Sequence, residues 1–598
     1  MLYLKETSVG IFAYLEHRER AKMTNTPWLV HYPSDVPKQL PPISFSNLPE
    51  LLRTAVQTYD KKVAFTQVMP NGMNGSLTYR QVHELSDQFA SYLREELKLS
   101  AGDRVAVQMP NCLSYPVVAF GVFKAGCVLV NTNPLYTATE MIHQFSDSGA
   151  TTLVVIDMFA DRLPEVLGKT NIKNVVVVKI SEYFPSVVGG VIRLVQKVWS
   201  RTLPKIEVEH TRFAKALELG KAKQSKERAA SYLSGVTNET VAALQYTGGT
   251  TGVSKGAMLS HGNLVANTLQ MIAHCGDGMR AGKETVLTAL PLYHIFAFTV
   301  NLLGFFHNGA RNILIPSPRP PSNLQRAFDN YKITWLSGVN TLFNALLNER
   351  WFQDSPPKHL RASAAGGMAL QASVAERWRK LTGTPIVEGY GLTESSPVLT
   401  FNLLTGLAKD GSIGIPIPST EVKCVDENGK DVAVGEAGEI IARGPQIMLG
   451  YWQRPDETAK TLKNGWLYTG DIAQMDADGF FTIVDRKKDM ILVSGFNVYP
   501  NEIEEQIAAV PGVMEVGVIG VPDEKTGERV QAYVKAVVPP PSREQIIAHC
   551  RNALAAYKIP QDVIFIDELP KSPIGKILRR ELRDQAMKSN SGNASKGA

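Results

Sequence analysis

At 598 residues the chain is several times longer than a typical domain, so at least two folding units are expected. Its 44% hydrophobic and 20% charged residues are those of an ordinary globular protein. The net charge of +6 is spread along the chain and predicts no nucleic-acid partner, and no apolar run reaches the ~18 residues needed to span a bilayer.

The N-terminal segment and the cysteines indicate the cellular compartment of the protein. A short apolar start is followed by charges, without the basic start, apolar core and cleavage site of a signal peptide. The five cysteines lie far apart and form no C-x-x-C pair, so we expect reduced core cysteines rather than disulfides or a zinc site. These features predict a cytoplasmic protein. Residues 1–22 are interpreted as an extension, since Met23 is a second candidate start.

From about residue 77 the chain alternates short apolar runs with longer amphipathic ones, which is typical of a parallel α/β sheet. Strands are predicted at 104–109, 127–130, 152–156, 175–180, 241–245, 312–315 and 333–337. Helices are predicted at 115–124 and 140–148. The predicted fold class is therefore α/β, with a large N-terminal domain of several subdomains built from βαβ sheets.

Residues 187–201 form a basic amphipathic segment. The apolar side chains expected on one side of a helix are Val187, Val188, Val191, Ile192, Leu194, Val195, Val198 and Trp199. Arg193, Lys197 and Arg201 are expected on the other side. Such a helix suits peripheral contact with an anionic bilayer, here the cytoplasmic face of the inner membrane. The alternative is a surface helix packed on the protein's own core, and Gly189-Gly190 weaken the helix at its start.

After Asp485 the pattern becomes that of a small α+β domain. Strands are predicted at 513–521 and 529–538 and a helix at 544–555. Three prolines at 539–541 separate the second strand from the helix. The chain is accordingly divided into an extension at 1–22, a large domain at 23–487, a small domain at 488–587 and a disordered tail at 588–598.

A glycine- and threonine-rich loop follows the strand predicted at 241–245. Its glycines would let the backbone approach phosphates, its N–H and hydroxyl groups would donate to them, and Lys255 adds positive charge. The candidate phosphate-binding residues are Thr247, Gly248, Gly249, Thr250, Thr251, Gly252 and Lys255. The loop is not a Walker A motif, because Ser254 precedes the lysine and Gly256 follows it.

Further motifs follow this loop in order. They are Gly366-Gly367, Gly389-Tyr390-Gly391-Leu392-Thr393-Glu394, Tyr468-Thr469-Gly470-Asp471, Asp485-Arg486-Lys487-Lys488-Asp489 and Pro570-Lys571-Ser572-Pro573-Ile574-Gly575-Lys576. Together with the loop they resemble the motifs of the adenylate-forming superfamily, which includes acyl-CoA synthetases, luciferases and the adenylation domains of peptide synthetases. The resemblance extends from about residue 50 to residue 582.

This resemblance implies a role for each matching residue. Besides the loop, the residues implied to bind ATP are Gly366, Gly367, Gly389, Tyr390, Gly391, Thr393, Asp471 and Arg486. Tyr390 would stack on adenine, and Asp471 would accept hydrogen bonds from both ribose hydroxyls. Glu394 would be the Mg²⁺ ligand, which suits a hard carboxylate oxygen. Lys488 is implied as the hinge, and Lys576 as the catalytic lysine that bridges the acyl carboxylate and the α-phosphate.

Three segments resemble family motifs that bind the acid substrate or the CoA thiol. Residues 464–492 resemble the fatty acyl-CoA synthetase signature more closely than the version in aryl or acetyl ligases. Residues 290–296 resemble the motif at the acyl entrance, where apolar side chains would line a tunnel. His294 is implied as a catalytic residue near the acyl carboxylate, with a packed core histidine as the alternative. Ser494 and Gly495 match the segment that lines the CoA channel.

The chain is most similar to bacterial long-chain fatty-acid–CoA ligases. The resemblance implies formation of acyl-AMP from ATP with release of pyrophosphate, and then transfer of the acyl group to CoA, with Mg²⁺ as the cofactor. Between the two steps the small domain would rotate about the hinge and withdraw Lys576. Homodimers occur in this family, so the resemblance is compatible with a homodimer of this chain.

Other functions remain open at this point. The enzymatic alternatives are a medium-chain or aryl acid–CoA ligase, and an adenylating enzyme that feeds a separate carrier protein. Few residues follow Lys576, so a fused carrier domain is not expected. A non-catalytic fatty-acid uptake or binding protein is the alternative from a different class, and the intact Glu394, Asp471 and Lys576 oppose it.

Overall fold

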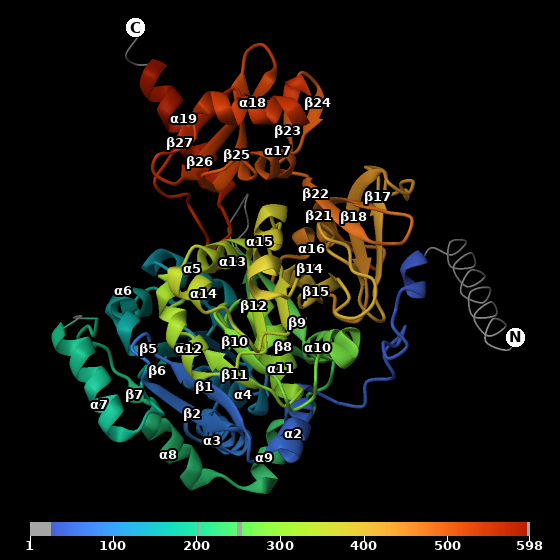
Figure 1. The fold of residues 1–598 in the computed structure, drawn as a ribbon. Helices are drawn as coiled ribbons and strands as arrows, with labels where there is room; N and C mark the ends of the chain where they lie inside the picture. Colours follow the sequence, from blue (N-terminus) through green and yellow to red (C-terminus); the bar gives the residue numbers. More distant parts are fainter. Residues whose placement is uncertain (1–25, 200–201, 248–253, 595–598) are drawn as a thin grey trace, which may run out of the picture.

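A computed structural model describes residues 26–199, 202–247 and 254–594. Figure 1 shows a large body, blue to orange, with a smaller domain in red above it. The expected extension at 1–22, the loop residues 248–252 and residues 595–598 lie outside the described residues.

The first sheet of the large body has eight strands in the order β19-β9-β8-β4-β3-β5-β6-β7. They are β3 (Arg104–Gln108), β4 (Val128–Thr132), β5 (Thr152–Ile156), β6 (Asn174–Val178), β7 (Thr211–Arg212), β8 (Val241–Thr247), β9 (Lys255–Ser260) and β19 (Gly450–Tyr451). The strands from β8 to β7 run parallel, whereas β9 pairs antiparallel with β8 and with β19. The predicted parallel α/β character of this part is confirmed.

The second sheet has nine strands in the order β16-β15-β14-β13-β12-β10-β11-β1-β2. They are β1 (Val63–Val68), β2 (Asn74–Thr78), β10 (Thr285–Thr288), β11 (Arg311–Leu314), β12 (Trp335–Gly338), β13 (Ala362–Ala365), β14 (Ile386–Gly391), β15 (Val398–Phe401) and β16 (Ile415–Pro416). Its centre is parallel, and β2, β15 and β16 add antiparallel edges. The strands predicted at 312–315 and 333–337 correspond to β11 and β12.

Helices cover these sheets. Those of the first half are α2 (Leu48–Tyr59), α3 (Tyr79–Ser91), α4 (Ser114–Lys124), α5 (Ala138–Ser148), α6 (Leu163–Leu167), α7 (Ser186–Leu194), α8 (Phe213–Lys223), α9 (Lys226–Tyr232) and α10 (His261–Cys275). The later ones are α11 (Phe305–His307), α12 (Gln325–Asn330), α13 (Asn340–Leu347), α14 (Arg350–Asp354), α15 (Ala372–Thr382) and α16 (Pro455–Thr461). The predicted helices at 115–124 and 140–148 are α4 and α5, and a Thr137–Glu140 capping box fixes the start of α5.

A third sheet links the large body to the small domain. It contains β17 (Glu421–Val425), β18 (Ala437–Arg443), β20 (Leu462–Lys463), β21 (Trp466–Met475) and β22 (Phe481–Arg486). The small domain follows with β23 (Ile491–Val493), β24 (Phe496–Val498), α17 (Pro500–Ala508), β25 (Val513–Asp523), β26 (Gly527–Ala536), α18 (Arg543–Ala553), β27 (Asp562–Phe565) and α19 (Arg579–Ala594). Its sheet packs against α17 and α19 and forms the predicted α+β unit.

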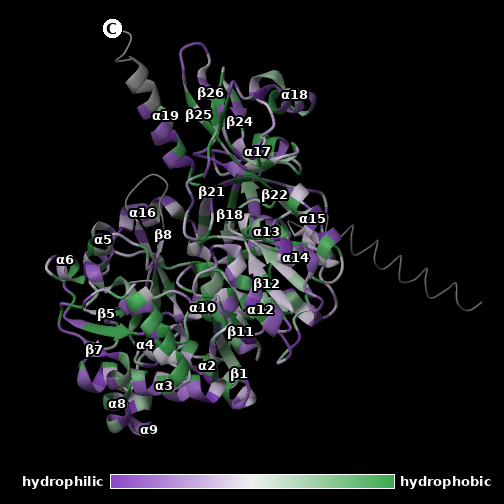
Figure 2. Cartoon of the chain, turned by 60° about the vertical axis from the view of Figure 1, so that its left-hand side comes forward, coloured by the Kyte–Doolittle hydropathy of each residue, from purple (hydrophilic) through white to green (hydrophobic). Residues whose placement is uncertain are grey.

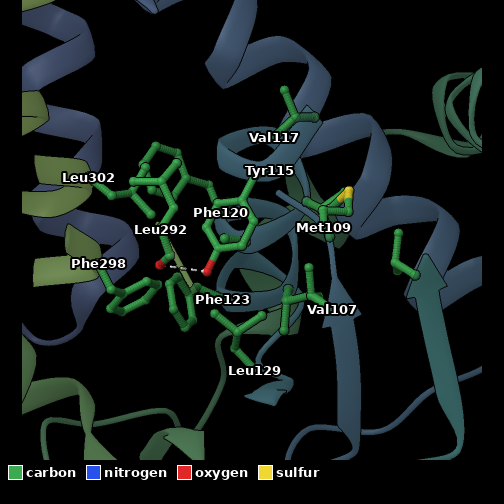
Figure 3. Packing of buried hydrophobic residues seen from close by; sticks show 14 of the residues in the cluster. Val107, Met109, Tyr115, Val117, Phe120, Phe123, Leu129, Leu292, Phe298 and Leu302 are labelled. Atoms are coloured by element: carbon green, nitrogen blue, oxygen red, sulfur yellow. Dashed lines mark hydrogen bonds between the residues drawn. The ribbon is translucent and has the colours of Figure 1, made fainter. Parts of the chain in front are cut away.

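The largest core cluster lies between α4, the first sheet and the π-helical segment η6 (Ala297–Gly304). Figure 3 shows Phe120, Phe123 and Phe298 packed there, with the Tyr115 hydroxyl pointing at Leu292. That hydroxyl lies 3.0 Å from the Leu292 carbonyl oxygen. The core thereby holds in place the segment 290–296, which resembles the acyl-entrance motif.

The hydropathy of each element follows its place in the fold. In Figure 2, β5 and α4 are hydrophobic (green), while hydrophilic residues (purple) gather on outer helices such as α8.

The five cysteines are free and buried, as predicted. The disordered tail predicted from residue 588 is wrong as far as Ala594, because α19 continues to that residue. Leu582 and Ala586 are buried against the small domain, and a helix anchored in this way propagates beyond its contact.

Candidate active site

A cavity of ≈ 2340 Å³ lies where the two sheets of the large body meet the small domain. It is lined by predicted site residues from both domains. These are Thr247, Lys255, His294, Gly366, Gly367, Gly389, Tyr390, Gly391, Thr393, Glu394, Asp471, Arg486, Lys488 and Lys576. The tertiary fold therefore brings residues from seven separate segments to one space.

The ends of the phosphate loop are held by neighbouring strands and helices. Thr247 ends β8 and Lys255 begins β9, and the two residues pair across an antiparallel register. The Ser254 hydroxyl donates to the Thr247 carbonyl oxygen at 2.6 Å, which closes the base of the loop. The Lys255 ammonium pairs with Glu457 and lies 5.0 Å from the centre of the Tyr451 ring. A cation at the loop exit suits a polyphosphate.

Tyr390 and Asp471 come from different sheets and meet in the cavity. The Tyr390 hydroxyl donates to Asp471 Oδ2 at 2.7 Å, and Arg486 Nε lies 3.3 Å from Asp471 Oδ1. Burial and the adjacent Asp471 charge raise the pKa of Tyr390 well above its usual value, so this hydroxyl stays protonated and remains a donor. The contact fixes both the aromatic ring and the carboxylate.

The glycines beside Tyr390 are required by packing. A Cβ on Gly391 would lie 1.8 Å from the Pro397 carbonyl oxygen, and one on Gly389 would lie 2.5 Å from Phe401 Cδ2. Phe401 belongs to β15 and Pro397 directly precedes it, so both clashes are with the strand that pairs antiparallel with β14. From the sequence, Tyr390 was expected to stack on adenine, and both glycines were expected to belong to the ATP site. The structure adds that they let β15 close over β14 and hold the ring at the cavity wall.

Glu394 is a buried carboxylate in the cavity wall, near Tyr451 and Lys255. The Tyr451 hydroxyl donates to its Oε1 at 2.6 Å, and burial raises the pKa of the carboxyl. Within the described ranges, no group of three or more histidine, cysteine, aspartate or glutamate side chains could hold a metal by itself. A single carboxylate next to a phosphate loop fits Mg²⁺, which typically binds through one or two carboxylates plus substrate phosphates.

Lys576 sits on a tight turn of the small domain that enters the cavity. The turn is closed by Ser572, whose backbone N–H donates to the Lys576 carbonyl oxygen at 2.8 Å and whose hydroxyl accepts from the Lys576 N–H at 3.1 Å. Gly575 has φ +91°, and a Cβ there would lie 2.6 Å from Thr341 Oγ1 of the large body. Burial, and then the charge of Arg486, lower the pKa of Lys576 to about 7.

His294 lines the same cavity. Burial and the nearby Lys576 charge lower its pKa to about 4, so the ring is neutral at pH 7. Its Nδ1 accepts from the Phe296 N–H at 3.3 Å, which leaves Nε2 as the proton-bearing nitrogen. The ring is thus partly packed, as the alternative interpretation held, but it also faces the cavity.

An apolar arm of the cavity includes side chains that the sequence did not single out. They are Met271 and Cys275 of α10, Val300 of η6, Trp335 of β12, and Val398 and Phe401 of β15. Trp335 lies within a predicted strand, yet nothing in the local pattern showed which face of that strand would meet α10. Long-range packing of α10 on β12 and β15 creates this arm.

Lys488 lies between β22 and β23, and burial lowers its pKa. Ser494 and Gly495 lie elsewhere, because they form the turn between β23 and β24. Both are exposed, and among the described residues they do not belong to the cavity lining. The structure therefore brings Lys576 into the cavity and leaves the candidate CoA residues outside it.

Comparisons with known proteins show the family of this chain. Models of the AMP-binding enzyme family and of the AMP-binding enzyme C-terminal domain match residues 52–452 and 502–576. Long-chain-fatty-acid–CoA ligases are 48% identical in Escherichia coli O157:H7, over 94% of this chain and 98% of the relative, and 42% identical in Haemophilus influenzae, over 93% and 98%. The crystal structure of the anthranilate CoA ligase AuaEII with anthranoyl-AMP superposes with a TM-score of 0.79 at 26% identity, covering 93% of this chain and 99% of that one.

Proposed function

Because this chain belongs to the AMP-binding enzyme family, we propose that it performs the reaction of its long-chain-fatty-acid–CoA ligase relatives with the cavity residues described above. The enzyme activates a long-chain fatty acid with ATP to acyl-AMP and pyrophosphate, and then transfers the acyl group to CoA. One observation supports the roles assigned to the cavity residues. Lys576 of the small domain and Glu394 and Asp471 of the large domain line one cavity.

In the first step the fatty-acid carboxylate attacks the α-phosphorus of ATP. A bond forms between the carboxylate oxygen and the phosphorus, the bond to the β-phosphate oxygen breaks, and pyrophosphate leaves. Asp471 and Tyr390 hold the ribose and adenine, while Thr393, Lys255 and the loop bind the phosphates. Lys576 bridges the acyl oxygen and the α-phosphate and stabilises the charge that shifts between them.

The lowered pKa of Lys576 fits this role. Negative charge from ATP and the fatty acid favours the ammonium form, so substrate binding would draw a proton onto Lys576. Glu394 would hold Mg²⁺ together with the phosphates, and Tyr451 would orient its carboxylate. When bound, Mg²⁺ neutralises phosphate charge and orients the polyphosphate for in-line attack.

The apolar arm is the candidate tunnel for the acyl chain. His294 lines the same cavity near Lys576, with a neutral ring that can donate a hydrogen bond to the acyl carboxylate from Nε2. The apolar lining from α10, β12 and β15 would bind an aliphatic chain without charge recognition. A medium-chain or aryl acid and a carrier-protein thiol are the alternative substrates.

The second step needs a different arrangement of the small domain. The CoA thiol attacks the acyl carbon, AMP leaves, and the thiol proton goes to solvent. Ser494 and Gly495 must approach the cavity for this step, whereas Lys576 occupies it in the present arrangement. We propose that the small domain, residues 488–587, rotates about Lys488 and exchanges the two segments.

Peripheral contact with the inner membrane from the cytoplasmic side is also proposed, through α7 and the π-helical turn η4 (Val195–Trp199). Five apolar side chains of this segment are 45–80% exposed, namely Val187, Val191, Leu194, Val195 and Val198. Ile192 faces the core, and Arg193 pairs with Asp157 at 3.3 Å, so the helix is docked while its outer face stays apolar. None of the helices described is long and apolar enough to cross a bilayer. Arg201 lies outside the described residues.

The proposed function is tested with purified protein, ATP, Mg²⁺, CoA and palmitate. We expect release of AMP and pyrophosphate and formation of palmitoyl-CoA, with Lys576→Ala reducing the rate at least about 100-fold, as for loss of a key electrostatic group. Lys571→Ala, on the same loop but paired with Glu515, is the matched control. Equal palmitate turnover by Lys576→Ala would refute the mechanism. Preference for acetate, octanoate or coumarate in an acid panel would refute the long-chain assignment.

A further inference from the structure

Arg579 begins α19, directly after the loop that carries Lys576, and it is buried among carboxyl groups. Its Nε and Nη2 donate to the two oxygens of Glu504 at 3.0 and 2.8 Å. Its Nη1 lies 3.2 Å from Asp485 Oδ1 and 3.4 Å from Asp489 Oδ2. The arginine is therefore bidentate to one carboxylate and shared with two others.

These carboxylates lie on different sides of the proposed hinge. Asp485 belongs to β22, which pairs with β21 of the large body. Glu504 belongs to α17 of the small domain, and Asp489 follows Lys488. The contact of Arg579 with Asp485 thus crosses the hinge, whereas its contact with Glu504 stays inside the small domain.

A second contact crosses the hinge at the same carboxylate. The backbone N–H of Asn501, in the first turn of α17, donates to Asp485 Oδ2 at 2.8 Å. The Asn501 side chain also accepts from Arg579 Nη2 at 2.5 Å and donates to the Val484 carbonyl oxygen at 3.3 Å. Asp485 is fully buried, so both of its oxygens depend on these partners and on the Arg486 N–H.

We propose that Asp485 and Arg579 form a releasable latch that positions Lys576 in the cavity and opens before the thiol step. This inference rests on the proposed two-step reaction. A rotation about Lys488 leaves Asp485 with the large body and carries Arg579 and Asn501 away. Arg579 keeps its bidentate partner Glu504 throughout, so the rotation breaks the latch without leaving the guanidinium unpaired.

The latch acts at a short distance from the catalytic lysine. Arg579 starts α19, and the turn that holds Lys576 leads directly into it. Fixing Arg579 on Asp485 therefore fixes the end of the Lys576 turn relative to β22, whose last residue, Arg486, contacts Asp471. Asp485 and Arg579 also line the cavity, but the latch acts on Lys576 through the turn and through β22, so the two are positioning residues.

The test uses Asp485→Asn in the full-length protein, because the amide keeps the size of the side chain and removes its charge. Arg579→Ala would leave the buried carboxyl groups of Asp485 and Glu504 without their cation, whereas Asp489 keeps Arg583, so this change serves only as a second variant. Two half-reactions are measured separately: single-turnover palmitoyl-AMP formation, and palmitoyl-CoA formation from supplied palmitoyl-AMP and CoA. We expect Asp485→Asn to slow the first about tenfold, the effect of losing a charged hydrogen bond, and to leave the second unchanged or faster.

Arg580→Ala is the matched control, since Arg580 is exposed and pairs with Asp584 on its own helix. Hydrogen exchange of the segment 499–504 gives a readout independent of activity, because the Asn501 amide reports the latch directly. Exchange should be faster in Asp485→Asn and unchanged in Arg580→Ala. Equal slowing of both half-reactions, or unchanged exchange, would overturn the latch. If the wild type forms no palmitoyl-CoA, the proposed function fails, while the exchange result still decides the latch.

Discussion

At the scale of single residues, Asp471 joins motifs that lie far apart in the chain. One of its oxygens accepts from Tyr390 and the other faces Arg486. Each motif had been assigned a separate contact with the nucleotide. Their mutual contacts mean that the ring, the carboxylate and the guanidinium are oriented by one another before ATP arrives. Such preorganisation reduces the ordering cost of binding.

Lys576 should titrate far below an ordinary lysine in the substrate-free protein. Burial and Arg486 lower its pKa from 10.5 to about 7, so it is mainly charged below pH 7 and mainly neutral above. We expect competitive acetylation, read by mass spectrometry across a pH series, to show a midpoint near pH 7 for Lys576. In Arg486→Gln the midpoint should rise, because a neighbouring positive charge is removed. A wild-type midpoint near 10.5 would contradict this account.

At the scale of elements, α7 and η4 differ from the other surface helices because their outer face is apolar. The segment is attached to the core by Ile192 and Val188 and by the ion pair between Arg193 and Asp157. Burial, partly offset by Arg193, raises the pKa of Asp157 to about 6. Exposed valine and leucine side chains gathered on one helix favour an apolar partner.

Membrane contact through this element is tested with vesicles of anionic phospholipid. Replacing Val191, Leu194 and Val198 by serine should reduce vesicle binding at least about tenfold, because three apolar side chains no longer enter the interface. Val434→Ser with Leu449→Ser is the matched control, since these residues are also exposed but lie in loops outside α7 and η4. Equal binding by the triple variant and the control would exclude α7 as the contact.

At the scale of the whole molecule, the small domain closes the cavity and contacts the large body at several points. The Ala372 N–H donates to Glu505 Oε1 at 3.1 Å, and Asn344 Nδ2 donates to the Met514 carbonyl oxygen at 2.8 Å. These contacts are polar, which fits the separation of the two domains in the proposed rotation. With Lys576 lining the cavity, the arrangement described here is the one that the proposed first step requires.

Locking this interface should separate the two reactions. Ala372→Cys and Glu505→Cys place thiols at one contact, and a short bismaleimide would join them, since the native cysteines are buried. The cross-linked enzyme is expected to form palmitoyl-AMP once per molecule and to lose CoA-dependent turnover about 100-fold, because rotation is blocked. The two single-cysteine variants, treated identically, are the controls. Full CoA-dependent turnover in the cross-linked protein would contradict domain rotation.

Local patterns were sufficient for much of the fold. The strands at 152–156 and 513–521 and the helix at 115–124 were predicted because apolar periodicity and turn residues act over a few neighbours. The tail was predicted as disordered from its composition, but the docking of Leu582 and Ala586 extends α19 to Ala594. That contact lies outside what a local pattern contains.

The sequence by itself determined the order of the motifs, the family they resemble and the chemical type of each site residue, since these depend on residue identity and spacing. Only the tertiary structure decided which of them meet. It placed Lys576 beside His294 and Arg486, left Ser494 and Gly495 outside the cavity, and set Arg579 across the proposed hinge from Asp485. The reason is that pKa shifts, ion pairs and cavity walls arise from groups that are distant in sequence and close in space.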